Sequence, residues 1–264
     1  MASRRVAAAV CVLTLILTLS GCVALESISS QESEDPAPED VFEGAFVHSD
    51  DLEDVEGIVT TTVTDGNETI EEREDRAERP YVEQRSETLE STDDDREGEV
   101  YVSNESMSWW YDSDAQAATY FESDEPFDTD EVRADRAEMA DEQRDLYDLE
   151  YQGTETIADR EAHVLDVEAK DEAVEAGLSI LVGDTEYVYA LETVDPDDEL
   201  DVVEQTIWID TEYAFPLKEH LVVDDPDGDR HELTERYETV SFNQDLGDET
   251  FDFEPPANTT VTAS

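Results

Sequence analysis

Carboxylate side chains occupy more than a quarter of this 264-residue sequence, and this excess limits what the chain can fold into. The 75 Asp and Glu residues face only 15 Lys and Arg residues, which gives a formal net charge of −60 at pH 7. Such a charge excludes a nucleic-acid-binding protein, because two polyanions repel each other. The chain nevertheless contains 38% hydrophobic residues, more than an acidic disordered tail carries. We therefore expect a folded domain with a carboxylate-rich surface.

The acidic residues are spread along the whole chain and do not form one terminal block. At about 1 M salt the Debye length is about 3 Å, so neighbouring surface carboxylates hardly repel one another in brine. We infer a source adapted to concentrated salt, namely an extreme halophile and more specifically a halophilic archaeon. The alternative is an acidic protein from an ordinary organism.

The first 22 residues indicate export and a lipid anchor. A short basic stretch ends at Arg5, an apolar run spans 6–19, and the sequence LSGC then ends at Cys22. The apolar run is too short to span a membrane comfortably. This order resembles the lipobox of bacterial and archaeal lipoproteins, in which the cysteine becomes the lipidated N-terminus. We expect a signal peptide at 1–21 and lipidation of Cys22.

The mature chain is expected to begin with a flexible acidic tether over 22–40. Cleavage would remove Cys11 and leave Cys22 alone, so the mature chain could form neither an intramolecular disulfide nor a cysteine metal cluster. Arg4 and Arg5 allow two interpretations: an ordinary basic start of a signal peptide, or a twin-arginine signal, which exports folded proteins. The predicted location is the cell membrane, with the lipid-anchored domain facing outside.

Residues 41–264 have the pattern of one mainly β domain that also contains helices. A helical stripe falls within 41–52, and six strand-like segments separated by short polar turns follow between 55 and 121. This succession indicates an antiparallel sheet. Strands resume after residue 150, and Phe251 and Phe253 are expected to complete the sheet.

Between these two groups of strands, the apolar period changes to that of a helix over 129–147. Asp128 and Glu131 have the spacing of a capping box at its start. The apolar stripe, which includes Met139 and Leu146, is thin, and this suits a helix lying across an opening better than one buried in a core. We expect this helix to act as a plug or lid.

A series of short motifs in a fixed order carries a resemblance to a known family. The motifs are YVSNESMSWWY at 101–111, YQGTETIADR at 151–160, QTIWID at 205–210, FPLK at 215–218 and DETFDFEPP at 248–256. Together they resemble the LolA-like lipoprotein carrier superfamily, which includes LolA-, LolB- and RseB-type proteins, over about residues 41–260. The resemblance implies an α+β, mainly β fold: a half-open, curved antiparallel β-barrel with helices plugging its mouth and an apolar cavity between them.

The resemblance and the apolar pattern together suggest a cavity for an acyl chain or another apolar ligand. Its candidate lining residues are Met107, Trp109, Tyr111, Tyr120, Phe121, Met139, Leu146, Trp208, Phe215 and Leu217. The alternative is that these side chains simply pack against each other. Arg85 is a candidate for holding a ligand head group, and the alternative there is an ion pair with a nearby acid.

The sequence contains no motif that supports catalysis. The histidines at 48, 163, 220 and 231 are not in a zinc-ligand spacing, and neither a nucleophile elbow nor a phosphate-binding glycine loop is present. The acidic segment 224–229 is out of register with an EF-hand loop, so we interpret it as a hairpin turn. We expect a protein that is not an enzyme and has no metal site and no cofactor.

Two functions remain open at this point. One is a membrane-anchored lipoprotein that binds lipid, acyl chains or another apolar ligand. The other is an envelope sensor or protein-interaction module of RseB type, whose cavity binds a segment of a membrane-protein partner without any carrier role. An anchor departs from the pattern of soluble carriers, since a shuttle must diffuse. Asn67, Asn104 and Asn258 each begin a glycosylation sequon and are candidate sites outside the cell.

Overall fold

The computed structural model describes residues 35–65, 68–123, 125–170, 178–182, 185–189, 201–224 and 230–264. The chain divides into two compact units, 1–35 and 36–264, and the fold described here is that of the second. The expected signal peptide, Cys22, most of the tether and Asn67 lie outside the described residues. Neither α-helix in the described ranges combines the length and the apolar character that a membrane crossing requires.

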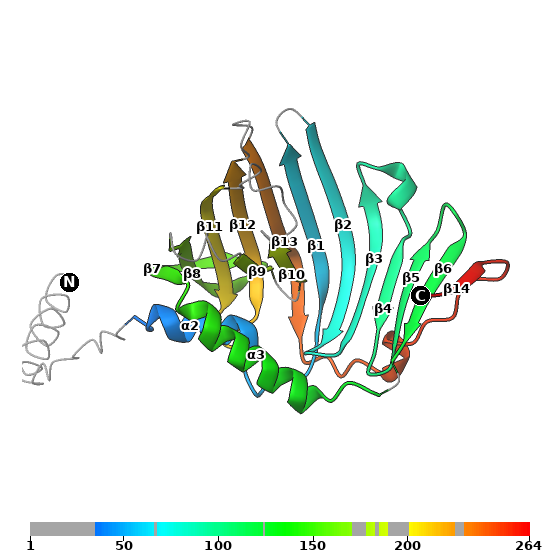
Figure 1. The fold of residues 1–264 in the computed structure, drawn as a ribbon, viewed down its shortest axis with the longest axis horizontal. Coiled ribbons are helices and arrows are strands. Elements are labelled where there is room, and N and C mark those ends of the chain that lie inside the picture. The colour runs from blue at the N-terminus through cyan, green and yellow to red at the C-terminus, as the bar shows by residue number, and fades with distance from the viewer. Residues whose placement is uncertain are drawn as a thin grey trace, which may run out of the picture. The chain divides into compact units, whose positions relative to one another are not determined.

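One open sheet of twelve strands dominates the described residues (Figure 1). Its strand order is β14-β6-β5-β4-β3-β2-β1-β13-β12-β11-β8-β7. Neighbouring strands run antiparallel, except that β14 is parallel to β6. Because β14 and β7 end the order without pairing to each other, the sheet is not closed. The expected mainly β, half-open and curved architecture with helices is therefore confirmed.

The strands differ in length, from four residues at one edge to thirteen near the centre. The main sheet consists of β1 Val55–Asp65, β2 Glu68–Arg79, β3 Glu83–Ser91, β4 Val100–Ser103, β5 Met107–Asp112, β6 Ala117–Glu122, β7 Tyr147–Ile157, β8 Arg160–Ala169, β11 Asp201–Asp210, β12 Pro216–Asp224, β13 Arg230–Phe242 and β14 Thr260–Ala263. A separate pair contains β9 Leu178–Val182 and β10 Thr185–Tyr189. The expected six consecutive strands are β1 to β6, which pair in chain order.

Two α-helices pack against each other at one end of the sheet (Figure 1). Helix α2 spans Pro38–Val47, so it begins three residues before the expected start at 41, with the proline in the first turn where it suits a helix. Helix α3 spans Thr129–Arg144, and the carboxylate of Asp128 caps it as expected. It ends three residues earlier than predicted, because Tyr147 already belongs to β7.

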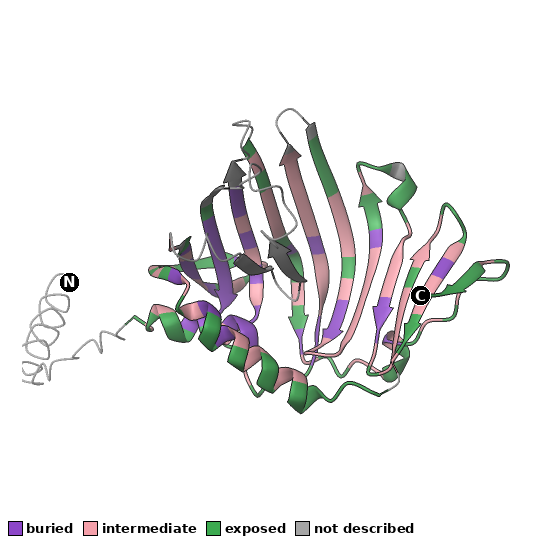
Figure 2. Ribbon diagram, in the orientation of Figure 1, coloured by how far each residue is buried: buried purple, intermediate pink, exposed green. Residues whose placement is uncertain are grey.

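Burial is concentrated where the helices meet the sheet. Figure 2 shows buried positions on β8, β11 and β12 and on the helix surfaces facing them, while β2 to β6 are mostly half-buried or exposed. The cluster beneath the helices consists of Val41, Phe42, Ala45, Phe46, Ala140, Tyr147, Leu165, Val167, Ile207, Ile209 and Leu221. A second cluster includes Val55, Val59, Trp208, Phe215, Leu217, Tyr237 and Phe242. The helices thus stabilise only one half of the sheet.

The expectation that Phe251 and Phe253 form a closing strand is wrong. Phe251 follows the short 3-10 helix η2 Asp248–Thr250, and its ring lies 5.1 Å from the guanidinium carbon of Arg79. Phe253 places its ring 5.8 Å from those of Trp109 and Tyr111. Both phenylalanines therefore belong to an irregular segment, from which their side chains contact the sheet, and β14 forms the edge of the sheet.

Candidate functional site

The register of strand pairing assigns each strand residue to one of two faces of the sheet, because directly paired residues point to the same side. One row of paired residues runs from β2 to β6 and consists of Arg76, Ser86, Tyr101, Trp110 and Thr119. We call the face that carries this row the inner face and the opposite one the outer face.

The inner face is also the face on which the helices pack. A second row of this face joins Glu74 of β2 through β1 to Tyr237 of β13. Two residues along β13, Glu235 pairs with Glu219 of β12, which pairs in turn with Ile207 of β11. Ile207 belongs to the cluster beneath the helices. In the described part of the chain, the helices therefore cover the inner face at β8, β11 and β12 and leave it accessible at β2 to β6.

The accessible part of the inner face holds two adjoining clefts, each of about 360 Å³. They share four lining residues: Glu74, Ser86, Tyr101 and Trp110. We call the two clefts together the inner-face groove. The rings of Tyr101 and Trp110 lie 5.2 Å apart, so an aromatic pair stands between the clefts. Trp110 is 48% exposed and is therefore available to a guest.

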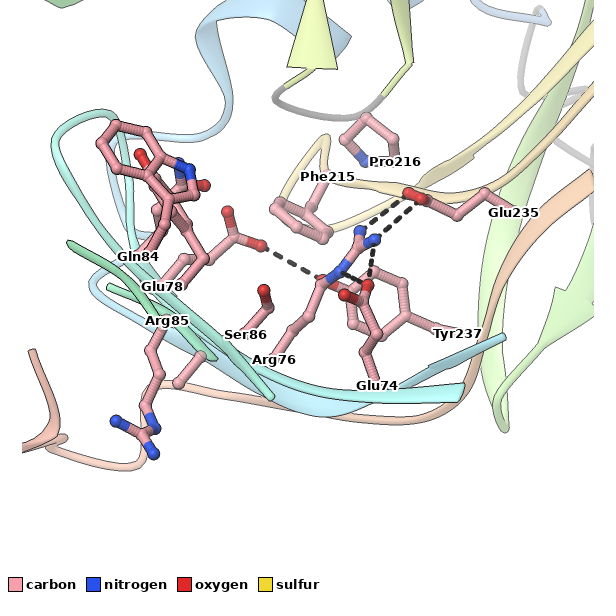
Figure 3. Close-up of a pocket in the computed structure, with 13 residues that line it drawn as sticks. Glu74, Arg76, Glu78, Gln84, Arg85, Ser86, Phe215, Pro216, Glu235 and Tyr237 are labelled. Atoms are coloured by element: carbon pink, nitrogen blue, oxygen red, sulfur yellow. Dashed lines mark hydrogen bonds and ion pairs between the residues drawn. The ribbon is translucent and has the colours of Figure 1, made fainter. Parts of the chain in front are cut away.

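The first cleft has a polar, charged floor (Figure 3). The guanidinium of Arg76 donates to Glu235 through two bonds of 2.9 Å and to Glu74 through bonds of 2.6 and 2.9 Å. Burial alone would lower the pKa of Arg76, but the charges of Glu235 and Glu74 outweigh it and raise that pKa well above its ordinary value. The hydroxyl of Tyr237 donates to Glu78 over 3.1 Å. The polar groups of the floor are thus held in place before any guest arrives.

The region beneath the helices is filled by the protein's own rings. Phe42 lies 5.0 Å from Phe46 and 5.8 Å from Tyr147, measured between ring centroids. Only about 20 Å³ of free volume remains there, which is close to the space one water molecule needs. Among the described residues, the region between the sheet and the helices therefore has no room for a guest, whereas the inner-face groove does, and so does a hollow of about 550 Å³ lined by residues of β7, β8 and β11.

Four of the predicted lining residues lie together on the outer face: Met107, Trp109, Tyr111 and Tyr120. Met107, Trp109 and Tyr111 share one face as the sequence indicated, and the groove is on the other, although Tyr111 also lines the second cleft. Trp109 packs 5.0 Å from Tyr120, and Phe253 covers part of this row. Phe121 is on the inner face, where it is 46% exposed, but it lines neither cleft.

The other predicted lining residues are divided between the core and the groove. Phe215 lines the first cleft, and Leu217 is buried in the second cluster. Met139 and Leu146 pack against the cluster beneath the helices. Trp208 is on the outer face beside Lys218, whose ammonium lies 3.7 Å from the centroid of the indole ring. The indole nitrogen of Trp208 donates to the carboxylate of Glu155 on β7.

Of the polar candidates, Arg85 is one of the residues that line the first cleft. Figure 3 shows its guanidinium pointing away from the cleft, and it pairs with Glu87 over 3.1 Å. The side-chain amide of Asn104 donates to the backbone of Phe251 and accepts from two backbone amides, whereas Asn258 is exposed. Across the described ranges, no group of three or more His, Cys, Asp or Glu side chains is arranged to hold a metal ion.

The sequence did not identify Arg76, Tyr101, Trp110 and Glu235 as site residues. The period of two in a strand gives residues 74, 76 and 78 a common face, but nearly every residue of this segment is polar, and only the pairing of β1 with β2 and β13 shows that Arg76 meets Glu235. Arg76 and Glu235 are 159 residues apart in the sequence, so no local sequence pattern indicates that they bind each other.

Comparison with known proteins gives matches among solved structures only. No family model matches the chain, and no curated protein matches its sequence. An uncharacterized conserved protein from Thermus thermophilus has 14% identity and a TM-score of 0.42, over 86% of this chain and 97% of that one. The LolA superfamily protein NE2245 from Nitrosomonas europaea has 11% identity and a TM-score of 0.35, over 83% and 98%. MucB, in the MucA/MucB complex from Pseudomonas aeruginosa, has 13% identity and a TM-score of 0.43, over 82% of this chain but 61% of MucB.

Proposed function

We propose that this chain is a lipid-anchored binding protein on the outer side of the cell membrane, and that its inner-face groove binds a segment of a partner polypeptide. The observation that supports this choice is the lining of the groove. It combines an aromatic pair with carboxyl, amide and hydroxyl groups, while the apolar region beneath the helices is already filled.

The chemistry of the floor favours a guest that can form hydrogen bonds. An acyl chain in the first cleft would remove Gln84 and Ser86 from water without offering them a partner, and each such group costs about 1–3 kcal/mol. A polypeptide backbone offers one donor and one acceptor per residue. Trp110 and Tyr101 can at the same time hold an apolar side chain of that segment, since aromatic residues dominate many protein interfaces.

The size of the groove agrees with a short segment and not with a large surface contact. Each cleft, at about 360 Å³, lies near the lower end of the range for ligand pockets. The two clefts adjoin at the Tyr101–Trp110 pair, so one extended segment can occupy both.

A second candidate function is the binding of a lipid or another apolar ligand. The observation in its favour is the exposure of Trp110 and Phe121 on the inner face. If a chain buried about 300 Å² of apolar surface there, it would gain about 7 kcal/mol before the entropic costs of binding. The acidic floor is the reason for ranking this candidate second.

The membrane anchor is part of the proposal and is supported by the sequence LSGC at 19–22. Lipidation of Cys22 would place the domain near the membrane surface, after export by either the general or the twin-arginine route. A partner segment presented by a membrane protein would then be within reach of the groove.

Photo-crosslinking in molar KCl tests the proposal. A benzophenone amino acid replaces Trp110 in the groove, and in the control protein it replaces Glu122, which is exposed on the outer face of β6. We expect a polypeptide adduct at position 110 and none at 122, read by mass spectrometry. A lipid adduct at 110 would support the second candidate function instead. If position 110 gave no adduct, both candidates would be contradicted.

A further inference from the structure

Glu219 is a buried carboxyl group that the groove does not use. It lies on β12 beneath α2 and is 2% exposed. One of its oxygens accepts a bond of 3.0 Å from the side-chain amide of Gln205. The other oxygen, Oε2, is buried and has no hydrogen-bond partner among the described residues. An acid in this position is tolerated only while it stays neutral.

Apart from the bond from Gln205, the groups around Glu219 do not compensate its charge. Helix α2 contributes Phe42, Ala45 and Phe46 to the small cavity beside it, and α3 contributes Gln143. The rest of the lining consists of Tyr147, Val167, Gln205, Ile207 and Pro216. None of these residues is basic. The cross-strand partner Glu235 is itself an acid, and its carboxylate is already bound to Arg76.

We propose that Glu219 is a proton-dependent latch for α2: the neutral carboxyl group allows the helix to pack on the inner face, and its ionisation weakens that packing and releases the helix. The physical reason is that an ionised carboxylate at this position would be buried without a positive partner. Such a charge costs several kcal/mol in a protein interior, and water reaching it from the side of α2 would relieve the cost. The helix is the element able to move, because the strands on both sides of β12 hold Glu219 in the sheet.

The titration of Glu219 places the latch in a defined pH range. Burial raises the pKa of Glu219 to about 8, the bond from Gln205 opposes this rise, and the charge of Glu235 adds to it. When α2 is released, the carboxyl is solvated and its pKa returns towards the ordinary value of 4.5. Between these two values the released state binds fewer protons than the packed state, so release becomes easier as the pH rises and levels off above about 8.

Release of α2 would change the inner face. Phe42 and Phe46 would leave the sheet, and the apolar side chains of β8, β11 and β12 beneath them would become accessible. Because α2 begins within the last residues of the expected tether, the latch would also change how the domain is connected to its anchor. This control is independent of which guest the groove binds.

Hydrogen exchange of the whole chain in molar KCl tests the latch. The protection factor of residues 38–47 is measured by mass spectrometry from pH 6 to 8, after correction for the intrinsic exchange rate. We expect it to fall by up to about tenfold per pH unit, while the protection of β1 stays unchanged.

Three variants decide the assignment. Glu219→Gln keeps the shape and the acceptor for Gln205, and we expect its α2 protection to be independent of pH. Should that variant fail to fold, Glu219→Met serves the same purpose. Glu204→Gln, at an exposed position of the neighbouring strand, should behave like the unmodified protein. The latch is refuted if the α2 protection of the unmodified protein shows no pH dependence, or if that dependence survives in Glu219→Gln.

Discussion

At the scale of single residues, Asp210 is a buried carboxylate whose negative charge is compensated by an arginine and by two backbone amides. Its side chain is 0% exposed, and Arg160 donates to its two oxygens over 2.8 and 3.0 Å. The backbone amides of Glu212 and Tyr213 donate to the same carboxylate. The hydrogen bond from Arg160 to Asp210 raises the pKa of the arginine above its ordinary value, despite the burial that opposes it. This carboxylate therefore joins the start of β8 to the turn between β11 and β12.

Replacing Asp210 should be the most costly of the acidic substitutions in this region. Asp210→Ala leaves Arg160 without its buried partner, and we expect the free energy of unfolding to fall by about 3–5 kcal/mol. The measurement is denaturant unfolding in molar KCl. Glu212→Gln is the matched control, because Glu212 pairs with the same arginine but is 62% exposed, so its loss should cost less than about 1 kcal/mol. Equal losses in the two variants would contradict the role assigned to Asp210.

At the scale of elements, the start of α3 depends on one side chain. Asp128 accepts from the backbone amides of Asp130 over 3.0 Å and Glu131 over 3.1 Å. Asp128→Ala removes both bonds, and we expect a loss of about 1 kcal/mol in the free energy of unfolding. Asp128→Asn keeps a capping oxygen and should lose much less. If the two variants lost equally, the charge of Asp128 and not its cap would be the stabilising feature.

The elements were predictable from the sequence because their signals are local. The cap at Asp128, the helical period after it and the turns between β1 and β6 all depend on residues within a few positions. The choice of face was not predictable. Alternation shows that Trp109 and Trp110 point to opposite sides, but their surroundings are set by Phe253 on one side and by the row from β2 on the other. Those contacts come from distant parts of the chain, and both faces of the sheet carry aromatic residues.

At the scale of the whole molecule, the net charge of −60 sets the conditions under which the fold persists. The acids far outnumber the basic residues, and their mutual repulsion opposes the compact state unless salt screens it. The open sheet adds to this sensitivity, because its accessible half has no covering layer of helices among the described residues.

We expect the protein to loosen when molar KCl is replaced by millimolar KCl. Circular dichroism should show loss of β structure, and the loss should be reversed when the salt is restored. The physical reason is that the Debye length grows from about 3 Å at 1 M to about 30 Å at 0.01 M, so that distant carboxylates begin to repel one another. An unchanged spectrum across this range would remove the inference of adaptation to brine.

The pairing of β1 has a consequence for how the protein can be made. This strand lies between β2 and β13, and its first residue, Val55, pairs with Phe242. During translation β2 follows β1 from the ribosome almost immediately, but β13 emerges only after β3 to β12 have been synthesised. The middle of the sheet therefore stays unfinished until then. A prematurely released chain would present β1 as an unpaired edge, the kind of surface on which nascent polypeptides aggregate.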